Sequence, residues 1–434
     1  MIRKKVYIAL SADSIHHAHI NLIKKGLEYG EITIGLLTDK AIASRKRIPL
    51  LSFSERKLIL NNIKGVSKVI PQNEWDYSIN ILKLKPDFMI HGDDWTKGPE
   101  LNLRSRAIKA LKKINGKLIE IPYTKGVSST ALAELQTKLG ITSDLRIKSL
   151  KRSLSSKPLS VFIETHSPIS AIIAEKTKIK TKSGFKQYDG FWSSSLTDST
   201  KLGMPDNEVL NLSERLENIS KIFEVTTKPL IMDIDTGGQL EHLKINAKSI
   251  ERSGVSAVIM EDKTGLKKNS LFGTSVKQTQ EKIKKFCEKI ETIKSNQVSE
   301  DFMVIARIES LILKKGMSDA LKRAKSYVSN GADGIMIHSK EKKPREVFEF
   351  SKRFKKLFKN VPLICVPTSY NSVKEIDLIK NNFNLVIYAN HLFRASYPAM
   401  LDTAKKILKF GRTKEIDKNL ISIKEILELI PGTK

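Results

Sequence analysis

Carboxylate side chains follow two apolar segments in the second half of the chain, where they could hold a divalent cation. Asp233 and Asp235 follow residues 230–232, and Glu261 follows the largely apolar run 255–260. Residues two apart on a strand point to the same side. Three hard oxygen ligands suit Mg²⁺, which keeps several waters and is completed by substrate oxygens. A pair of acidic strand caps is the alternative, but such close like charges would repel without a cation, so we expect Mg²⁺ at these three residues.

The segment after Glu261 could close over an anionic substrate. Residues 261–270 read EDKTGLKKNS, and Gly265 and Gly273 lie near the two ends of the stretch 264–274. Glycine permits backbone conformations that other residues avoid, so it suits hinges. We predict a lid that excludes water and brings Lys267 to the substrate. An ordinary charged loop is the alternative.

Histidines lie close together near the N-terminus, where they could contact phosphate groups. Residues 16–19 read HHAH and follow the strand-like run 6–12. His16 and His19 are three apart, so they share a face of a first helical turn. The N-terminal end of a helix favours anions. Surface histidines in a loop are the alternative.

Strand and helix patterns alternate along the whole chain and define the elements that must position these groups. This alternation predicts an α/β protein with parallel sheets. The first block has five predicted strands, at 6–12, 31–38, 67–71, 87–92 and 117–122. The second block has eight, at 159–164, 188–193, 229–234, 255–261, 302–308, 332–338, 362–367 and 385–389. Eight strands separated by helices predict a (β/α)8 barrel.

Chemically capable side chains end nearly every strand of the second block. These ends converge on one face of a barrel, where active sites lie. The residues are Glu164 and His166, Trp192 and Ser194, Asp233 and Asp235, Glu261 and Asp262, Arg307 and Glu309, His338 and Ser339, Thr368 and Ser369, and Asn390 and His391. We therefore predict a Rossmann-like domain over 1–140, an exposed linker or short connecting helix over 141–158, and a barrel over 159–434.

The composition limits the classes of partner. The 434 residues carry a formal net charge of +29. Nucleic-acid binding is one interpretation of this charge, and the gathering of small phosphorylated substrates is the other. The basic residues are scattered along helices, so we expect no nucleic-acid partner. The two cysteines cannot form a disulfide framework. Without a run of roughly 18 apolar residues or a leader pattern, we expect a cytoplasmic protein with no membrane partner.

Three ordered motifs in the first block resemble those of the cytidylyltransferase group of nucleotidyltransferases. They are HHAH at 16–19, HGDDW at 91–95 and SST at 128–130. Ala18 stands where that family usually has glycine. The resemblance implies that an anionic oxygen attacks the α-phosphorus of CTP and that pyrophosphate leaves. It also implies the site residues: His16 and His19 stabilise the pyrophosphate, Asp93 and Trp95 contact the nucleotide, and Ser128, Ser129 and Thr130 bind phosphate.

The second block resembles phosphoenolpyruvate phosphomutase, a member of the isocitrate lyase superfamily. The motifs are GFWSSSL at 190–196, LGMPD at 202–206, DIDTG at 233–237, EDKTGLKKNS at 261–270, ARIE at 306–309 and HSK at 338–340. The lyases of this superfamily carry a catalytic cysteine in a KKCGH-like stretch at the lid. This chain has no cysteine there, which argues against a carbon–carbon lyase.

The resemblance implies a role for each matched residue of the barrel. Ser195 stands where the family usually has glycine. The implied roles are substrate-carboxylate binding for Trp192, Ser194 and Ser195, a place beside the migrating phosphoryl group for Asp206, contact with that group from the lid for Asn269, binding of its oxygens for Arg307 and His338, and Mg²⁺ binding for Asp233, Asp235 and Glu261.

Two functional hypotheses follow from these resemblances. In the first, the barrel interconverts phosphoenolpyruvate and phosphonopyruvate, and the first domain transfers CMP from CTP to a phosphonate. In the second, the barrel is a phosphonopyruvate hydrolase and the first domain binds nucleotide or regulates. Asn269 favours the mutase. The family resemblance also implies a homo-oligomer with helices exchanged at the C-terminal end of the barrel.

Overall fold

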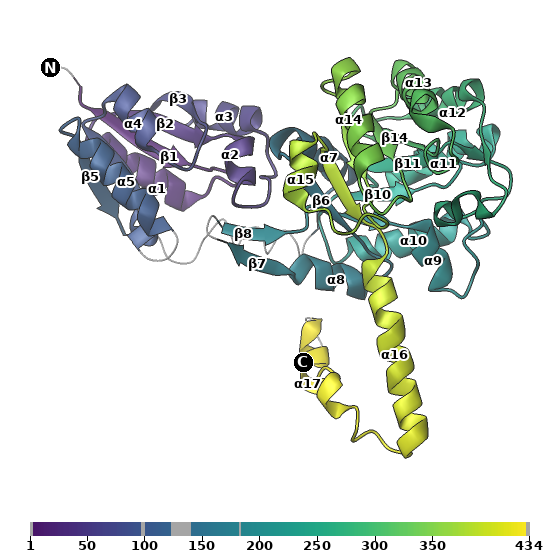
Figure 1. The fold of residues 1–434 in the computed structure, drawn as a ribbon. Helices are drawn as coiled ribbons and strands as arrows, with labels where there is room; N and C mark the ends of the chain where they lie inside the picture. Colours follow the sequence, from purple (N-terminus) through teal and green to yellow (C-terminus); the bar gives the residue numbers. More distant parts are fainter. Residues whose placement is uncertain (1–2, 97–99, 123–139, 182–183, 431–434) are drawn as a thin grey trace. The chain divides into compact units, whose positions relative to one another are not determined.

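The computed structural model describes residues 3–96, 100–122, 140–181 and 184–430. The chain divides into two compact units, Met1–Ala389 and Asn390–Lys434, and each is described by itself. The first unit contains an open parallel sheet and then, further along the chain, a closed barrel (Figure 1). The predicted α/β class, with two parallel sheets in this order, is confirmed.

The open sheet has the strand order β3-β2-β1-β4-β5, and all of its pairs are parallel. Because side chains alternate along a strand, Ile8 of β1 packs on one face of the sheet and Tyr7 on the other. The strands are β1 Lys5–Leu10, β2 Glu31–Leu37, β3 Val66–Gln72, β4 Phe88–Gly92 and β5 Lys117–Ile121. The helices are α1 His17–Leu27, α2 Asp39–Ala43, α3 Phe53–Asn61, α4 Ser78–Leu84 and α5 Leu101–Lys112, with the 3-10 turn η1 Asp93–Thr96.

The barrel closes from eight parallel strands in the order β10-β11-β14-β15-β16-β17-β6-β9. Its strands are β6 Ser160–Glu164, β9 Gly190–Ser193, β10 Leu230–Asp233, β11 Ala257–Glu261, β14 Met303–Ile308, β15 Gly334–Ile337, β16 Leu363–Cys365 and β17 Leu385–Tyr388. Its helices are α8 Pro168–Lys176, α9 Ser195–Thr200, α10 Leu212–Phe223, α11 Leu240–Arg252, α12 Ile283–Asn296, α13 Gly316–Ser329, α14 Arg345–Leu357 and α15 Glu375–Lys380. Each of the eight predicted strands matches one of these.

The basic, serine-rich stretch before the barrel forms helix α7, Ser143–Ser156. Leu150 is fully buried in the cluster that fills the barrel interior, together with Phe162 and Ile364. The Ser153 hydroxyl lies 2.9 Å from that of Ser160, the first residue of β6. This helix therefore packs at the N-terminal ends of the strands, opposite the face where we expect the active site, although it precedes the predicted barrel boundary at 159.

Two short antiparallel ladders were not predicted. One joins β7 Lys178–Thr181 to β8 Gly184–Gln187. The other joins β12 Lys263–Thr264 to β13 Thr279–Gln280 and closes the base of the predicted lid. Between these two strands lies the 3-10 segment η3, Ser270–Ser275, in which Gly273 adopts φ 54° and ψ −129°. The lid is thus a closed excursion from the end of β11.

The second unit consists mainly of α16 His391–Phe410, followed by η4 Asp417–Asn419 and α17 Ile423–Leu429. Helix α16 has no buried residue. Tyr397, Met400 and Leu408 are 62%, 60% and 86% exposed. Among the described residues, every helix is too short or too polar to cross a bilayer.

Candidate active site

The predicted site residues of the barrel come from neighbouring strands and converge where those strands end. Asp233 ends β10 and Glu261 ends β11. Glu261 is the register partner of Arg307 in β14, and β15, which leads to His338, pairs with β14 in turn. All four residues are buried. Parallel pairing therefore brings carboxylates, a guanidinium and an imidazole to one edge of the barrel.

The two aspartates after β10 form a compact turn. The main-chain N–H of Asp235 donates to Asp233 Oδ1 at 3.0 Å, and the Ser195 hydroxyl donates to Asp233 Oδ2 at 3.2 Å. Asp235 adopts φ 55°, a left-handed conformation that costs free energy for a non-glycine residue. Burial raises the pKa of Asp235, and Asp233 adds to the rise although Lys267 counters it. The turn thus holds two close carboxylates that need positive charge.

Glu261 is buried with oxygens left unsatisfied by the described residues, as expected of a carboxylate that binds a cation. Its two oxygens are buried and accept no hydrogen bond within the described residues. Lys263 Nζ lies 3.1 Å from one oxygen and Arg307 Nη2 lies 3.2 Å from the other, so these cations are close but not directed along hydrogen bonds. Burial raises the pKa of Glu261 to about 7 despite them.

The three predicted metal ligands do not form a finished coordination shell. No group of three or more histidine, cysteine, aspartate or glutamate side chains in the described ranges is placed to hold a metal directly. Mg²⁺ needs few protein ligands because it retains waters and takes substrate oxygens. The unsatisfied oxygens of Glu261, near the Asp233 and Asp235 turn, therefore fit a hydrated Mg²⁺ held partly through water.

The lid reaches into this site through two side chains. Lys267 Nζ donates to Asp206 Oδ1 at 2.7 Å and to the Ser195 hydroxyl at 2.6 Å, and it also forms an ion pair with Asp235. Asn269 Nδ2 donates to Asp206 Oδ2 at 3.0 Å. Burial opposes the charge on Lys267, but the surrounding carboxylates, Asp235 first, raise its pKa well above the usual value. The lid is therefore closed and carries a fixed positive charge into the site.

Arg307, Glu309 and His338 form a second charged cluster. Arg307 Nε donates to Glu309 Oε1 at 2.6 Å, and Arg307 Nη2 lies 3.2 Å from His338 Nδ1. Burial and the nearby guanidinium lower the pKa of His338, which favours the neutral imidazole. Burial opposes the charge on Arg307, but Glu309 and Glu261 raise its pKa. The guanidinium is therefore fixed in place and remains charged.

The residues predicted to hold a substrate carboxylate end β9 and begin α9. Ser194 and Ser195 are 6% and 5% exposed. The Ser195 hydroxyl accepts from Lys267 and donates to Asp233, so it connects the lid to the aspartate turn. Trp192 packs in the barrel interior, and its indole N–H is buried with no partner among the described residues. The structure thus brings Ser195 to the charged groups and leaves one buried donor at Trp192.

The first sheet carries the histidine pair at the start of α1. His16 caps this helix, and its main-chain N–H donates to His19 Nδ1 at 3.3 Å. The two ring centroids lie 4.0 Å apart. Burial lowers the pKa of both imidazoles, to about 4 for His19, and each pKa is lowered further by a neighbouring histidine. The predicted helical face is confirmed, and it presents two neutral imidazoles.

The HGDDW segment is built around buried aromatic rings. His91 and Trp95 stack with centroids 3.7 Å apart and planes 10° apart. The Trp95 indole donates to Glu120 Oε1 at 2.8 Å, and the same carboxylate accepts two bonds from Arg104. Asp93 is exposed. Trp95, only 1% exposed, is therefore placed to shape the segment. Ser128, Ser129 and Thr130 lie outside the described residues, so their role stays a prediction.

Comparison with known proteins places both halves of the chain. The phosphoenolpyruvate phosphomutase family model matches residues 150–408. This chain belongs to the phosphoenolpyruvate phosphomutase family. A cytidylyltransferase-like family model matches residues 11–135, the region that contains the histidine pair.

The curated relatives and solved structures include two activities of this family. A phosphoenolpyruvate phosphomutase of Tetrahymena pyriformis is 35% identical over 64% of this chain and 89% of its own length. A phosphonopyruvate hydrolase of Variovorax is 36% identical over 65% of this chain and 93% of its own. The crystal structure of a Streptomyces platensis phosphomutase aligns with a TM-score of 0.60 and 32% identity, covering 65% of this chain and 94% of the other. A phosphonopyruvate hydrolase crystallised with oxalate and Mg²⁺ aligns with a TM-score of 0.58 and 34% identity, over 67% and 95%.

Several residues of the phosphomutase-family site received no role from the sequence. Arg215 of α10 lies with Nη1 3.7 Å from Asp235 and with Nε 3.1 Å from Asp198. Lys263 lies under the lid, beside Glu261. Side chains two residues apart on a strand point to the same side, so the sequence could have indicated that Lys263 lies beside Glu261. No sequence signal marks Arg215, because α10 is far along the chain from the carboxylate that it meets.

Proposed function

We propose that this phosphomutase-family protein is a bifunctional enzyme of phosphonate biosynthesis. Its barrel interconverts phosphoenolpyruvate and phosphonopyruvate with Mg²⁺, and its first domain transfers CMP from CTP to a phosphonate with release of pyrophosphate. The closed lid is the observation that carries the barrel assignment, since Lys267 and Asn269 both reach the half-buried Asp206. A sealed site is what a captive phosphoryl group requires.

The barrel reaction moves a phosphoryl group within one substrate. The P–O bond of phosphoenolpyruvate breaks, and a P–C bond forms to the third carbon of the pyruvate enolate. A loose phosphoryl-transfer path requires positive charge and hydrogen-bond donors around the moving group. Arg307, the neutral His338 and Asn269 supply them in this proposal. Bound Mg²⁺ would neutralise the enolate and carboxylate oxygens.

Substrate orientation falls to the residues between β9 and the aspartate turn. Ser194 and Ser195 would hold the carboxylate of the substrate, and the unpartnered indole N–H of Trp192 offers a further donor. Asp233, Asp235 and Glu261 would hold the hydrated cation. The closed lid places the positive charge of Lys267 beside Asp235 and Asp206. It would also exclude water from the phosphoryl group.

Phosphonopyruvate hydrolysis is the second candidate for the barrel. The hydrolase relative is 36% identical and the mutase relative 35%, so identity does not separate them. The contact of Asn269 with Asp206 favours the mutase, because it seals the lid over the site. Incubation with phosphonopyruvate and Mg²⁺ should yield phosphoenolpyruvate. Accumulation of pyruvate and inorganic phosphate in its place would contradict the mutase.

CMP transfer by the first domain rests on the match of residues 11–135 and on the histidine pair. In-line displacement at the α-phosphorus needs positioned charge rather than a protein nucleophile. Phosphorus NMR of the protein with CTP, Mg²⁺ and a panel of phosphonates should reveal a CMP-phosphonate and pyrophosphate. We expect His16→Ala to abolish both signals, and unchanged transfer would remove His16 from the catalytic role.

The second unit supports a homo-oligomer. Helix α16 buries none of its residues within a single chain and presents Tyr397, Met400 and Leu408 to solvent. Large exposed apolar surfaces mark protein–protein contacts. We propose that α16 is exchanged between copies. Light scattering should give the mass of a dimer or larger assembly, and a monomer at micromolar concentration would contradict this.

A further inference from the structure

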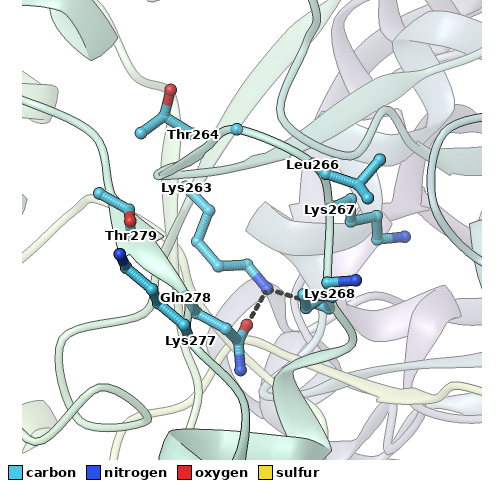
Figure 2. Close-up of a pocket in the computed structure, with 9 residues that line it drawn as sticks. Lys263, Thr264, Leu266, Lys267, Lys268, Lys277, Gln278 and Thr279 are labelled. Carbon is cyan, nitrogen blue, oxygen red and sulfur yellow. Dashed lines mark hydrogen bonds between the residues drawn. The ribbon is translucent and has the colours of Figure 1, made fainter.

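A buried lysine at the base of the lid has no part in the chemistry above. Lys263, the first residue of β12, is 3% exposed. Its ammonium donates to the main-chain oxygen of Lys268 at 2.7 Å, to the Ser270 hydroxyl at 3.0 Å and to Gln278 Oε1 at 3.0 Å. Figure 2 shows this side chain extending between the two legs of the lid, with bonds to Lys268 and Gln278. All three donor hydrogens of the ammonium therefore hold lid residues.

The same ammonium also belongs to a closed ring of charged and polar groups. Lys263 Nζ lies 3.1 Å from one oxygen of Glu261, whose other oxygen lies 3.2 Å from Arg307 Nη2. Arg307 Nη2 donates to the Ser270 hydroxyl at 2.6 Å, and Ser270 in turn accepts from Lys263. The lid residue Ser270 therefore accepts directly from Arg307, which is proposed to bind the phosphoryl group. It is connected through Lys263 to Glu261, a proposed metal ligand.

The main-chain carbonyl of Lys268, which accepts a hydrogen bond from the Lys263 ammonium, lies at a critical position in the lid. Lys268 lies between Lys267 and Asn269, the two side chains that reach Asp206. A bond to the Lys268 main chain fixes the backbone from which both project. Hydrogen bonds from a charged donor stabilise a structure more than those between neutral groups. Much of the closed lid's geometry therefore depends on Lys263, a residue to which the proposed reaction assigns no step.

We propose that Lys263 is the positioning residue that keeps the lid closed and so decides whether the phosphoryl group is transferred or hydrolysed. This inference rests on the proposed phosphomutase activity of the barrel. Without the ammonium the lid legs separate and water enters. Hydrolysis then breaks the P–C bond of phosphonopyruvate, the water oxygen bonds to phosphorus, and a proton of the water goes to the enolate carbon, giving pyruvate and inorganic phosphate.

The experiment compares three variants of the full chain. Lys263→Met removes the ammonium and keeps much of the length of the side chain, and Lys263→Arg keeps the charge. Lys277→Met is the matched control, since Lys277 is an exposed lysine on the return leg of the same lid (Figure 2). Hydrogen exchange of peptides from 264–279 reports lid closure without substrate. The ratio of pyruvate to phosphoenolpyruvate formed from phosphonopyruvate reports capture.

For Lys263→Met we expect at least about tenfold faster exchange of the lid amides and a rise of similar size in the product ratio. Lys263→Arg should lie between this variant and the wild type, and Lys277→Met should match the wild type in both measurements. Lid exchange equal to that of Lys277→Met, or a slower reaction with an unchanged product ratio, would overturn the proposal.

A further variant, at Gln278, tests the proposal if Lys263→Met fails to fold. Gln278→Leu removes one acceptor of the Lys263 ammonium and also the hydrogen bond from Gln278 Nε2 to the main-chain oxygen of Gly273. It should shift both measurements in the same direction by about threefold. No shift would overturn the proposed role of Lys263. The wild type could form no phosphoenolpyruvate while exchange of the lid amides still responds to the substitutions as predicted. In that case the role of Lys263 in holding the lid closed stands, and the proposed phosphomutase activity fails.

Discussion

The barrel mouth and the histidine pair at the start of α1 differ in whether their ionisable groups are already charged. At the barrel mouth, buried cations and carboxylates already meet one another, as in Arg307 with Glu309 and Lys267 with Asp206. At the start of α1, burial lowers the pKa of His16 and His19, so the pair is neutral until a ligand brings charge. In the proposed function, the charges of the barrel mouth are therefore already in place for a moving phosphoryl group, whereas the histidine pair would become charged only when nucleotide binds.

This difference has a consequence for substitutions. A buried charge that loses its partner is costly, because neither water nor another ion replaces that partner. The barrel should therefore respond steeply to changes in geometry at constant charge. The first site should respond to pH and to the removal of single imidazoles. Substitutions at either site should leave the other reaction nearly unchanged.

The largest effect is expected from Arg307→Lys. Lysine keeps the positive charge but lacks the fork that meets Glu309, Ser270 and Glu261 together. Loss of a preorganised donor typically costs about 10²–10³ in kcat, and we expect the upper end for phosphonopyruvate turnover. CMP transfer by the same preparation is the control and should stay within about twofold. A loss of less than tenfold in the barrel reaction would show that fixed geometry matters less than charge.

The next effect is expected from His19→Asn in the first domain. Asparagine can still accept the bond from the His16 main chain but cannot carry a positive charge. We expect CMP transfer to fall by about 10², the lower end for loss of a charge-stabilising group. His17→Asn, at the exposed neighbouring position, is the matched control. Equal activity of the two variants would argue that the histidine pair is structural.

Nucleotide binding to the first domain should take up protons. In the protein without nucleotide, the pKa of His19 is about 4 and that of His16 is also lowered, so both imidazoles are neutral at pH 7. A bound triphosphate favours the charged forms and raises both pKa values. CTP affinity should thus increase as pH falls from 7 towards 5, by up to about tenfold per pH unit for each proton bound. Calorimetry at pH 6 in buffers of different ionisation enthalpy measures this uptake, which should shrink in His19→Asn.

The smallest effect is expected from Ser195→Ala at the barrel mouth. The hydroxyl accepts from Lys267 and donates to Asp233, but both of those groups keep other partners. A hydrogen bond is typically worth about 1 kcal/mol net, or roughly fivefold in rate. We therefore expect about a fivefold loss in kcat for the barrel reaction and a melting temperature lowered by no more than about 4 °C. A loss above a hundredfold would place Ser195 among the groups that contact the reacting atoms.

The sequence predicted most of the fold because each buried strand is a short apolar run that ends in polar residues. Asp233, Glu261 and Arg307 could be placed at one edge for this reason, since parallel strands bring their C-terminal ends together. The ladder of β12 and β13 was missed, because two-residue strands have no periodicity to detect.

The remaining residues could not be predicted because their roles depend on distant partners. Asp262 stands between Glu261 and Lys263 in the motif, yet its side chain accepts from Tyr327 at 2.7 Å, on the opposite side of the strand. The Trp95 indole donates to Glu120, 25 residues away. Contact with a nucleotide remains a prediction for Trp95, and a supporting role is now the simpler interpretation. Such pairings are set by packing and not by local spacing.

In the proposed function, the barrel transfers a phosphoryl group without releasing it to water. Phosphorus NMR of the protein with phosphonopyruvate and Mg²⁺ in ¹⁸O-labelled water tests this most directly, because ¹⁸O bound to phosphorus shifts its resonance. We predict that phosphoenolpyruvate appears first and carries no ¹⁸O on its three non-bridging phosphoryl oxygens. Early appearance of inorganic phosphate that contains one ¹⁸O atom, with no phosphoenolpyruvate, would show that water captures the phosphoryl group and that the barrel is a hydrolase.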